Sequence, residues 1–191
     1  MNNWISPVSL YMLFFVLISN AQDVLTTSQL PIISNYVLDS DKSILSKTKS
    51  SLKHSTLLSA LNASDLADLL NYSGQFTVFA PSNLAFKKLS KLTIEKLLDP
   101  KNKKELNAFL SGHIIARKLS ASYILQSMCR GSGKASFTTI QGEKLIATME
   151  GIDIILTDKY GNQARIMTAD TNQSNGVIHE IDTVFLPVTS L

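Results

Sequence analysis

The chain has 191 residues, of which 45% are hydrophobic and 17% are charged, with a formal net charge of +3. That length suits one domain that buries about 70% of its unfolded surface, and the small charge favours no particular class of partner. Cys129 is the only cysteine, which excludes an internal disulfide, so packing must supply the stability.

The N-terminus predicts a secretion signal. Val8 to Ile18 form a largely apolar run of 11 residues, whereas a helix that spans a bilayer needs about 20. The small residues Ser19 and Ala21 follow, as signal peptidase requires. We therefore predict that residues 1–21 are a signal peptide removed after Ala21. The mature form would have no membrane span and would be secreted, to the extracellular space or the periplasm.

A polar arm and a helical region come next. Residues 22–42 are polar and are interrupted by Pro31, which indicates an arm leading into the domain. From 43 to about 71, leucines recur at three- and four-residue spacings, which predicts helices. These leucines are Leu57, Leu58, Leu61, Leu66, Leu69 and Leu70. Ser64 is the expected N-cap of the second helix in this region.

The middle of the chain predicts a buried strand and then three helices. Residues 76–80 are β-branched and aromatic and lie between Gly74 and Pro81, as is typical of a buried strand. Ser82 or Asn83 can cap a helix from Leu84, and Thr93 can cap another that ends at Asp99. A third helix, with its apolar face at Leu106, Phe109 and Leu110, should end near Gly112.

The second half of the chain has the pattern of strands. The segments 135–140, 144–149, 152–156 and 163–168 are separated by breaks that each contain a glycine, as hairpin turns require. A final pair, 177–181 and 184–186, follows the Asn175-Gly176 turn. Helices followed by an antiparallel meander predict a single α+β domain.

Two segments carry a family resemblance. They are FTVFAPSNLAF at residues 76–86 and SNGVIHEIDTVFLP at residues 174–187, and together they resemble the two hallmark blocks of the fasciclin domain. Between them, residues 112–115 (GHII) are similar to the Tyr-His block of the family, and residues 139–145 (TIQGEKL) resemble its central hairpin. The resemblance covers residues 43–188, nearly the whole mature chain.

The resemblance implies a β-sandwich or wedge with a layer of helices. It also implies an adhesion or binding module without catalysis, attached to matrix, a surface protein or a polysaccharide. The positions it marks for binding are Asp170, Thr171 and His113. Gly112 stands where the family often has Tyr, and Thr171 stands where adhesive members often have Ile.

Asp170 is the residue on which the functional hypothesis depends. It opens the polar run 170–175, which is too hydrophilic for a core and predicts a surface loop. An exposed carboxylate on such a loop is commonly only solvated. The alternative is contact with a ligand, because the loop occupies the place of the acidic residue in adhesive family members.

No metal or cofactor is expected. His54, His113 and His179 are too far apart in sequence for a local zinc motif, and a hydrogen-bonded structural role is expected for the last two. Residues 39–50 begin like a calcium loop, but Ile44 replaces the required glycine and Ser50 the required glutamate. The chain contains no phosphate loop, dinucleotide fingerprint or Gly-x-Ser-x-Gly elbow.

The lysines and Cys129 leave further alternatives. Seven lysines lie between Lys87 and Lys104, without the arginines and aromatic residues that nucleic-acid binding favours. They predict a solvated helix face, with anionic polysaccharide binding as an alternative. Cys129 is inert and buried, or pairs with a second chain in a self-associating matrix component. An enzyme that uses Cys129 or a histidine is the least favoured hypothesis.

Overall fold

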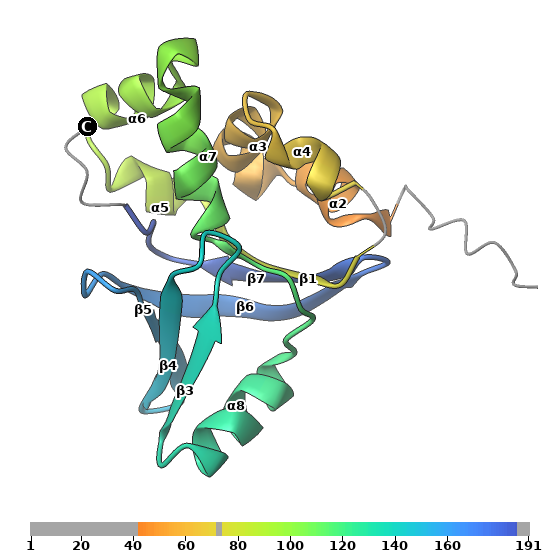
Figure 1. The fold of residues 1–191 in the computed structure, drawn as a ribbon, viewed down its shortest axis with the longest axis vertical. Coiled ribbons are helices and arrows are strands. Elements are labelled where there is room, and N and C mark those ends of the chain that lie inside the picture. The colour runs from red at the N-terminus through yellow and green to blue at the C-terminus, as the bar shows by residue number, and fades with distance from the viewer. Residues whose placement is uncertain (1–41, 72–73, 187–191) are drawn as a thin grey trace, which may run out of the picture. The chain divides into compact units, whose positions relative to one another are not determined.

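Six helices form a layer on one side of the central strands (Figure 1). This computed structural model describes residues 42–71 and 74–186, which all fall within one compact unit. The predicted signal peptide, 1–21, lies outside the described residues, as does the predicted arm apart from Lys42. The helices of this layer are α2 (Ile44–Ser50), α3 (Ser55–Asn62), α4 (Leu66–Leu69), α5 (Asn83–Lys87), α6 (Lys91–Leu98) and α7 (Lys103–Ser111). Two 3-10 turns, η2 (Leu52–His54) and η3 (Pro100–Asn102), join them.

Serine side chains cap the N-termini of four helices. Ser43, Ser82, Ser90 and Ser120 each accept a hydrogen bond from a backbone N–H in the first turn of their helix. The predicted cap Ser82 is therefore confirmed. Thr93 as a cap is wrong, because Ser90 starts α6 three residues earlier and Thr93 donates its N–H to the Ser90 hydroxyl. Ser64 as the N-cap of the second helix is also wrong, because Asp65 holds that position in α4, although the Ser64 hydroxyl accepts the N–H of Leu66.

Seven strands form one sheet in the described residues. They are β1 (Phe76–Pro81), β2 (Ile114–Ile115), β3 (Lys134–Thr138), β4 (Lys144–Glu150), β5 (Asp153–Thr157), β6 (Gln163–Gln173) and β7 (Gly176–Ile181). Their order is β2-β1-β7-β6-β5-β4-β3, with β1 and β7 parallel and the other pairs antiparallel. The two halves of the sheet diverge like a wedge, with β6 shared between them (Figure 1). The predicted α+β architecture is confirmed.

Two hydrophobic clusters occupy the two sides of β1. Strand residues alternate between faces, so Val78 and Ala80 pack with the helix layer while Phe79 faces the other way. The second cluster is closed by α8 (Ala121–Arg130), which contacts β3 and β4 and contributes Ile124 and Met128. The sheet therefore has apolar packing on both faces, and its buried polar residues must find partners inside the protein.

One helix was missed by the sequence patterns, and two further segments differ from their predicted structure. The helix α8 was not predicted, and Cys129 lies on it with its side chain exposed, which excludes the buried alternative for this thiol. The predicted strand 184–186 is absent: Val184 and Phe185 are buried without belonging to a strand. The predicted surface loop 170–175 is mostly strand, because β6 continues to Gln173. In the described residues, no helix is long and apolar enough to cross a membrane.

Candidate functional site

The two hallmark blocks lie side by side. Strand β1, from the first block, pairs along its full length with β7, from the second, in a register that runs from Phe76–Gly176 to Pro81–Ile181. At the entry of this pair, Asn175 is buried and its side chain accepts the N–H of Ile44 (2.8 Å) and donates to the carbonyl of Leu70 (2.7 Å). The Asn-Gly turn therefore ties α2 and α4 to the sheet.

His113 lies in the core, just before β2. Its Nδ1 lies 2.9 Å from the carbonyl oxygen of Phe109, and its Nε2 accepts the N–H of Phe185 (3.1 Å). Burial lowers the pKa of His113 from 6.5 to about 4, although the Phe109 carbonyl and the charge of Asp158 oppose the shift. His113 is therefore neutral, and both ring nitrogens already have partners inside the protein.

His179, in β7, is held in the same way. Its Nε2 donates to the carbonyl oxygen of Leu119 (2.7 Å), its Nδ1 accepts the backbone N–H of Asp170 (3.2 Å), and its ring stacks on Phe79. Burial lowers the pKa of His179, against the raising effects of the Leu119 carbonyl and of Asp170. The structural role predicted for this histidine is confirmed.

Asp170 is half-buried and faces α8. Its Oδ1 accepts the N–H of Ala121, the first residue of that helix, at 2.8 Å. A carboxylate is favoured at this place by the unsatisfied N–H groups and by the helix dipole. Its backbone has φ of +57°, which Asp and Asn tolerate better than most residues. Asp170, on which the functional hypothesis depends, therefore holds the N-terminus of α8.

Thr171 faces the opposite side of the sheet from Asp170. It lines a cavity between β6, β7 and the helix layer, together with Thr168 and Ile178. The three predicted binding residues are therefore not gathered at one place. Of the three, only Thr171 lines this cavity. The binding role of all three stays a prediction.

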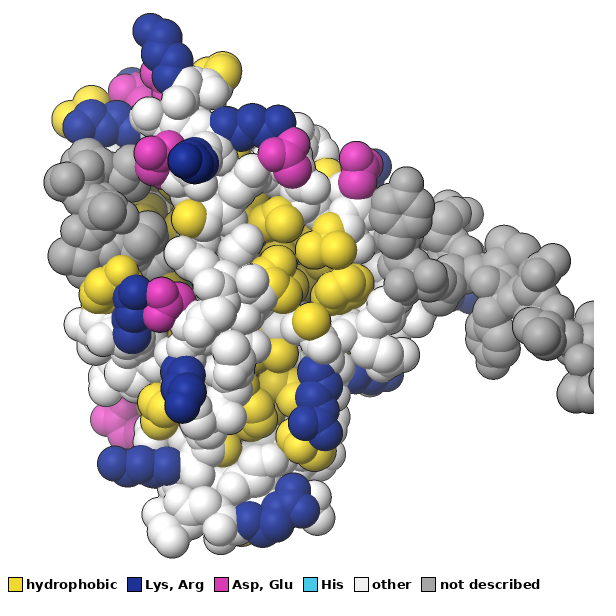
Figure 2. Space-filling model, viewed as in Figure 1, with side chains coloured by type: hydrophobic (Ala, Val, Ile, Leu, Met, Phe, Trp, Pro, Cys, Tyr) yellow, Lys and Arg dark blue, Asp and Glu magenta, His cyan; other side chains and the backbone are white. Residues whose placement is uncertain are grey.

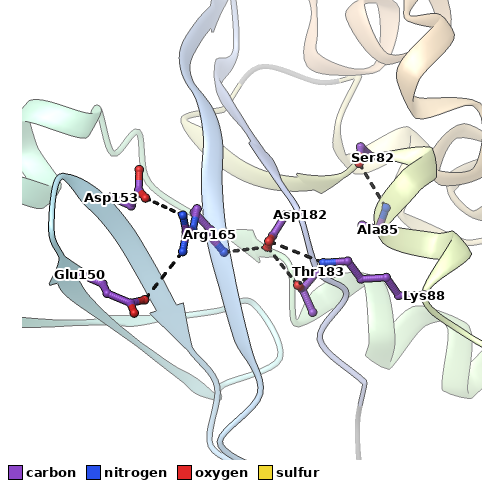
Figure 3. A network of polar contacts seen from close by, with 8 residues as sticks. All are labelled: Ser82, Ala85, Lys88, Glu150, Asp153, Arg165, Asp182 and Thr183. Atoms are coloured by element: carbon purple, nitrogen blue, oxygen red, sulfur yellow. Dashed lines mark hydrogen bonds and ion pairs between the residues drawn. The ribbon is translucent and has the colours of Figure 1, made fainter.

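A second polar network gathers around Arg165 of β6 (Figure 3). The Arg165 guanidinium lies 2.7 Å from Asp153 and 3.9 Å from Glu150, and its backbone N–H donates to Asp182. Asp182, in the second hallmark block, also pairs with Lys88 at the end of α5. Burial raises the pKa of Asp182, but the bonds from the Arg165 N–H and the Thr183 hydroxyl and the charge of Lys88 together lower it below its usual value. This network joins β4, β5 and β6 to the end of α5.

The geometry offers no catalytic grouping in the part of the chain that the structure describes. There, no three His, Cys, Asp or Glu residues are placed to hold a metal ion. Cys129 is exposed on α8, whereas His113 and His179 are buried and fully bonded. His54 lies in η2, between α2 and α3, and Figure 1 shows these two helices on the opposite side of the sheet from α8. A histidine base is therefore not paired with the thiol in this arrangement.

The basic surface is the main charged feature. Residues 83–111 carry seven lysines and three acidic residues, an excess of positive charge larger than the +3 of the whole chain. All seven lysines are exposed on α5, α6, η3 and α7, as predicted, and charged side chains cover the helices at the top of Figure 2. Lys88, Lys91 and Lys103 pair with carboxylates, whereas Lys87, Lys96, Lys101 and Lys104 form no ion pair in the described residues.

A comparison with known protein families identifies the family to which this chain belongs. A model described as "Fasciclin domain" matches residues 52–187. The chain belongs to the fasciclin domain family. This confirms the resemblance carried by the two hallmark blocks, which the structure places in adjacent strands.

Relatives occur in several organisms. Protein sll1483 of Synechocystis sp. is 35% identical over 162 residues, 85% of this chain and 83% of that protein. Cell surface glycolipoprotein MPB83 of Mycobacterium bovis is 33% identical over 138 residues, 70% of this chain and 55% of that protein. A solved FAS1 domain pair from the insect cell adhesion molecule Fasciclin I matches with a TM-score of 0.67 and 20% identity. It covers 76% of this chain and 51% of that chain, and it supports the fold alone.

Several residues of this site were missed from sequence. Asn175 was assigned only to a turn, and the capping role of Asp170 was not expected. The available signal was local: a polar residue directly before or inside an apolar strand is buried, and it must then find a hydrogen-bond partner. The identity of those partners, 49 to 131 residues away, depends on the tertiary fold.

Proposed function

We propose that this protein is an exported, non-catalytic attachment module that works at a cell surface or in the matrix and engages a surface protein or polysaccharide. Membership of the fasciclin domain family supports the proposal. So does a related protein that is named as a cell surface glycolipoprotein. Export follows from the predicted signal peptide, residues 1–21.

The basic surface of α5–α7 carries this proposal. Three polar side chains of the second hallmark block are occupied within the protein: His179 bonds to Leu119, Asn175 to the helix layer and Asp182 to Arg165. The lysines Lys87, Lys96, Lys101 and Lys104 are exposed and lack carboxylate partners among the described residues. A cluster of exposed cations attracts a polyanion and releases its counterions, so binding through it should weaken steeply with salt.

The three residues marked by the family resemblance take different parts in the proposal. His113 and Asp170 act as positioning residues, because each holds a neighbouring segment through its own hydrogen bonds. Thr171 is the candidate for direct ligand contact, since its side chain lines a cavity. No cofactor takes part.

Binding to immobilised dextran sulfate, with uncharged dextran as the reference, tests the role of the basic surface. We expect salt-sensitive binding to dextran sulfate only. Changing Lys87, Lys96, Lys101 and Lys104 to Gln should weaken it at least about tenfold. The control changes the exposed lysines Lys49, Lys118, Lys134 and Lys144 to Gln, which alters net charge equally. Equal loss in both variants, or no binding by the wild type, would contradict this surface.

Self-association is a second candidate, and the exposure of Cys129 favours it. An accessible thiol in an oxidising compartment can pair with the same residue of a second copy. Sedimentation of the protein with and without reductant separates this candidate from a monomeric module, because a disulfide dimer would dissociate on reduction.

A further inference from the structure

A cavity of about 130 Å³ lies between the helix layer and the sheet, away from the basic surface. Its walls come from the end of α2 and η2 on one side and from β6 and β7 on the other. Ala80 and Ile178 supply apolar surface, and the remaining lining residues are polar or charged. Since water occupies about 30 Å³ per molecule in the liquid, the space fits a small ligand group rather than a polymer chain.

A β-bulge puts two threonines on the same wall. Thr168 pairs with Glu180 and Thr171 pairs with Ile178, so that two residues of β6 oppose the single residue His179. Without the bulge, residues three apart would face opposite sides of the sheet. With it, both threonines line the cavity while Asp170 turns to α8. Neither threonine hydroxyl has a hydrogen-bond partner among the described residues.

The opposite wall carries an unpaired polar atom. His54 lines the cavity, and its Nε2 is buried without a partner in the described residues, while its Nδ1 lies 2.8 Å from the Ser51 hydroxyl. Burial lowers the pKa of His54, Glu180 raises it and Lys53 lowers it, and the ring is neutral at pH 7. A buried polar atom without a partner is costly, so a ligand that completes its hydrogen bond gains affinity.

The charged side chains that line the cavity favour a ligand with a single negative charge. Lys47 and Lys53 supply two cations, and Glu180 supplies one carboxylate, which lies 3.7 Å from Lys53 and is 17% exposed. Glu180 also needs a hydrogen-bond donor from any ligand that displaces Lys53. We propose that this cavity is a binding site for the carboxylate end of an acidic sugar, with the lysines holding the carboxylate and Glu180 and the threonines holding adjacent hydroxyls.

Two other anions fit less well. A phosphate group at pH 7 carries more negative charge, and Glu180 would repel it at short range. An acidic peptide side chain brings only acceptor atoms to the cavity, which leaves Glu180 without a donor. A uronate offers one carboxylate and several hydroxyl donors on one ring, which matches the mixed lining.

Histidine ring signals provide a direct test, because the chain has three histidines. We expect D-glucuronate to shift the His54 Cε1–H signal of the purified protein, with a dissociation constant on the order of 1 mM for a ligand of this size. His113 and His179 are internal references, since both are already fully bonded. D-glucose, which has CH₂OH in place of the carboxylate, should give no shift.

Variants assign the effect to the cavity. Thr171→Val and Lys53→Gln should each weaken glucuronate binding at least about fivefold, while Thr148→Val on β4 and Lys104→Gln on α7 should leave it unchanged. Lys53 is 72% exposed, so Lys53→Gln keeps the test valid if Thr171→Val fails to fold. Equal shifts with glucose, tighter binding of phosphate or of an acidic tripeptide, or unchanged binding in Lys53→Gln would each overturn the proposal. Dextran sulfate binding through α5–α7 is independent of all these outcomes.

Discussion

Ala121 and Asp170 lie 49 residues apart in the sequence and are joined by a hydrogen bond of 2.8 Å, from the first N–H of α8 to the carboxylate in β6. The same aspartate donates its backbone N–H to His179. One residue of the predicted adhesive loop therefore connects a helix to the hallmark strand β7.

Asp170→Ala should lower stability by about 1–3 kcal/mol, because it removes the acceptor of the Ala121 N–H and places Ala at φ of +57°. Asp170→Asn should be nearly neutral, since Asn keeps an acceptor and tolerates that backbone conformation. Urea denaturation checks the difference, and hydrogen exchange should show faster opening of α8 in the Ala variant. Equal midpoints for Ala and wild type would mean that the carboxylate does not anchor α8.

Gly176 is the glycine that the fold tolerates least. Its φ is +151°, and a Cβ there would lie 2.0 Å from the carbonyl oxygen of Phe76. We expect Gly176→Val to cost more than about 1 kcal/mol, as the turn alone predicts, with the clash adding to that cost. Gly161→Ala is the control, because its φ is +85° but a Cβ there meets nothing within 4 Å. If urea denaturation shows equal losses of stability for both variants, the close approach of β1 and β7 at Gly176 does not contribute to the cost of the substitution.

Stability should fall as the pH drops from about 6.5 towards 4. The unfolded chain binds a proton on His113 near pH 6.5, whereas the folded protein binds it only near pH 4, so acid favours unfolding within that window. A proton on Nε2 would face the N–H of Phe185, which that atom already accepts. The full loss, reached below about pH 4, is roughly 3 kcal/mol.

Urea midpoints at several pH values measure this dependence. His113→Gln should be less stable at pH 7 and should show a shallower decline between pH 6.5 and 5, because the titrating group is gone. His179, whose pKa is lowered by burial as well, leaves a residual slope in the same direction. A slope identical to that of the wild type would exclude His113 as its source.

Cys129 should react with a thiol-alkylating reagent in the native protein, without denaturant, because its side chain is exposed on α8. One modification per chain is expected by intact mass, and Cys129→Ser should show none. Modification should change the free energy of unfolding by no more than about 0.5 kcal/mol, as for other exposed positions. Labelling only after unfolding would contradict the exposed position of this thiol.

Cleavage between Ala21 and Gln22 is the expected export step. Intact-mass measurement of material recovered outside the cell should give the mass of residues 22–191. Replacing Ala21 with a bulky residue such as Phe should block or displace the cut, because signal peptidase requires a small residue there. Retention of residues 1–21 on exported protein would refute the prediction.

Local patterns in the sequence predict the family, the class of fold and most of the elements. Hydrophobic periods are local, so strand β1, the helices α3 and α7 and the hairpin between β3 and β4 could be predicted from short windows. The resemblance of the two hallmark blocks to the fasciclin domain links two segments that lie far apart in the sequence and that pair as β1 and β7. The missed helix α8 and the mistaken strand 184–186 show the limit of that method, since a short apolar run fits several structures.

Only the tertiary structure decided what the polar residues do. Asp170 and Thr171 are adjacent in a hydrophilic run that predicts a loop, yet a bulge in β6 turns one to α8 and the other to a cavity. The partners of Asp170, Asn175 and His113 lie up to 131 residues away. A hydrogen bond depends on distance and direction in space, and local sequence patterns fix neither for residues brought together by folding.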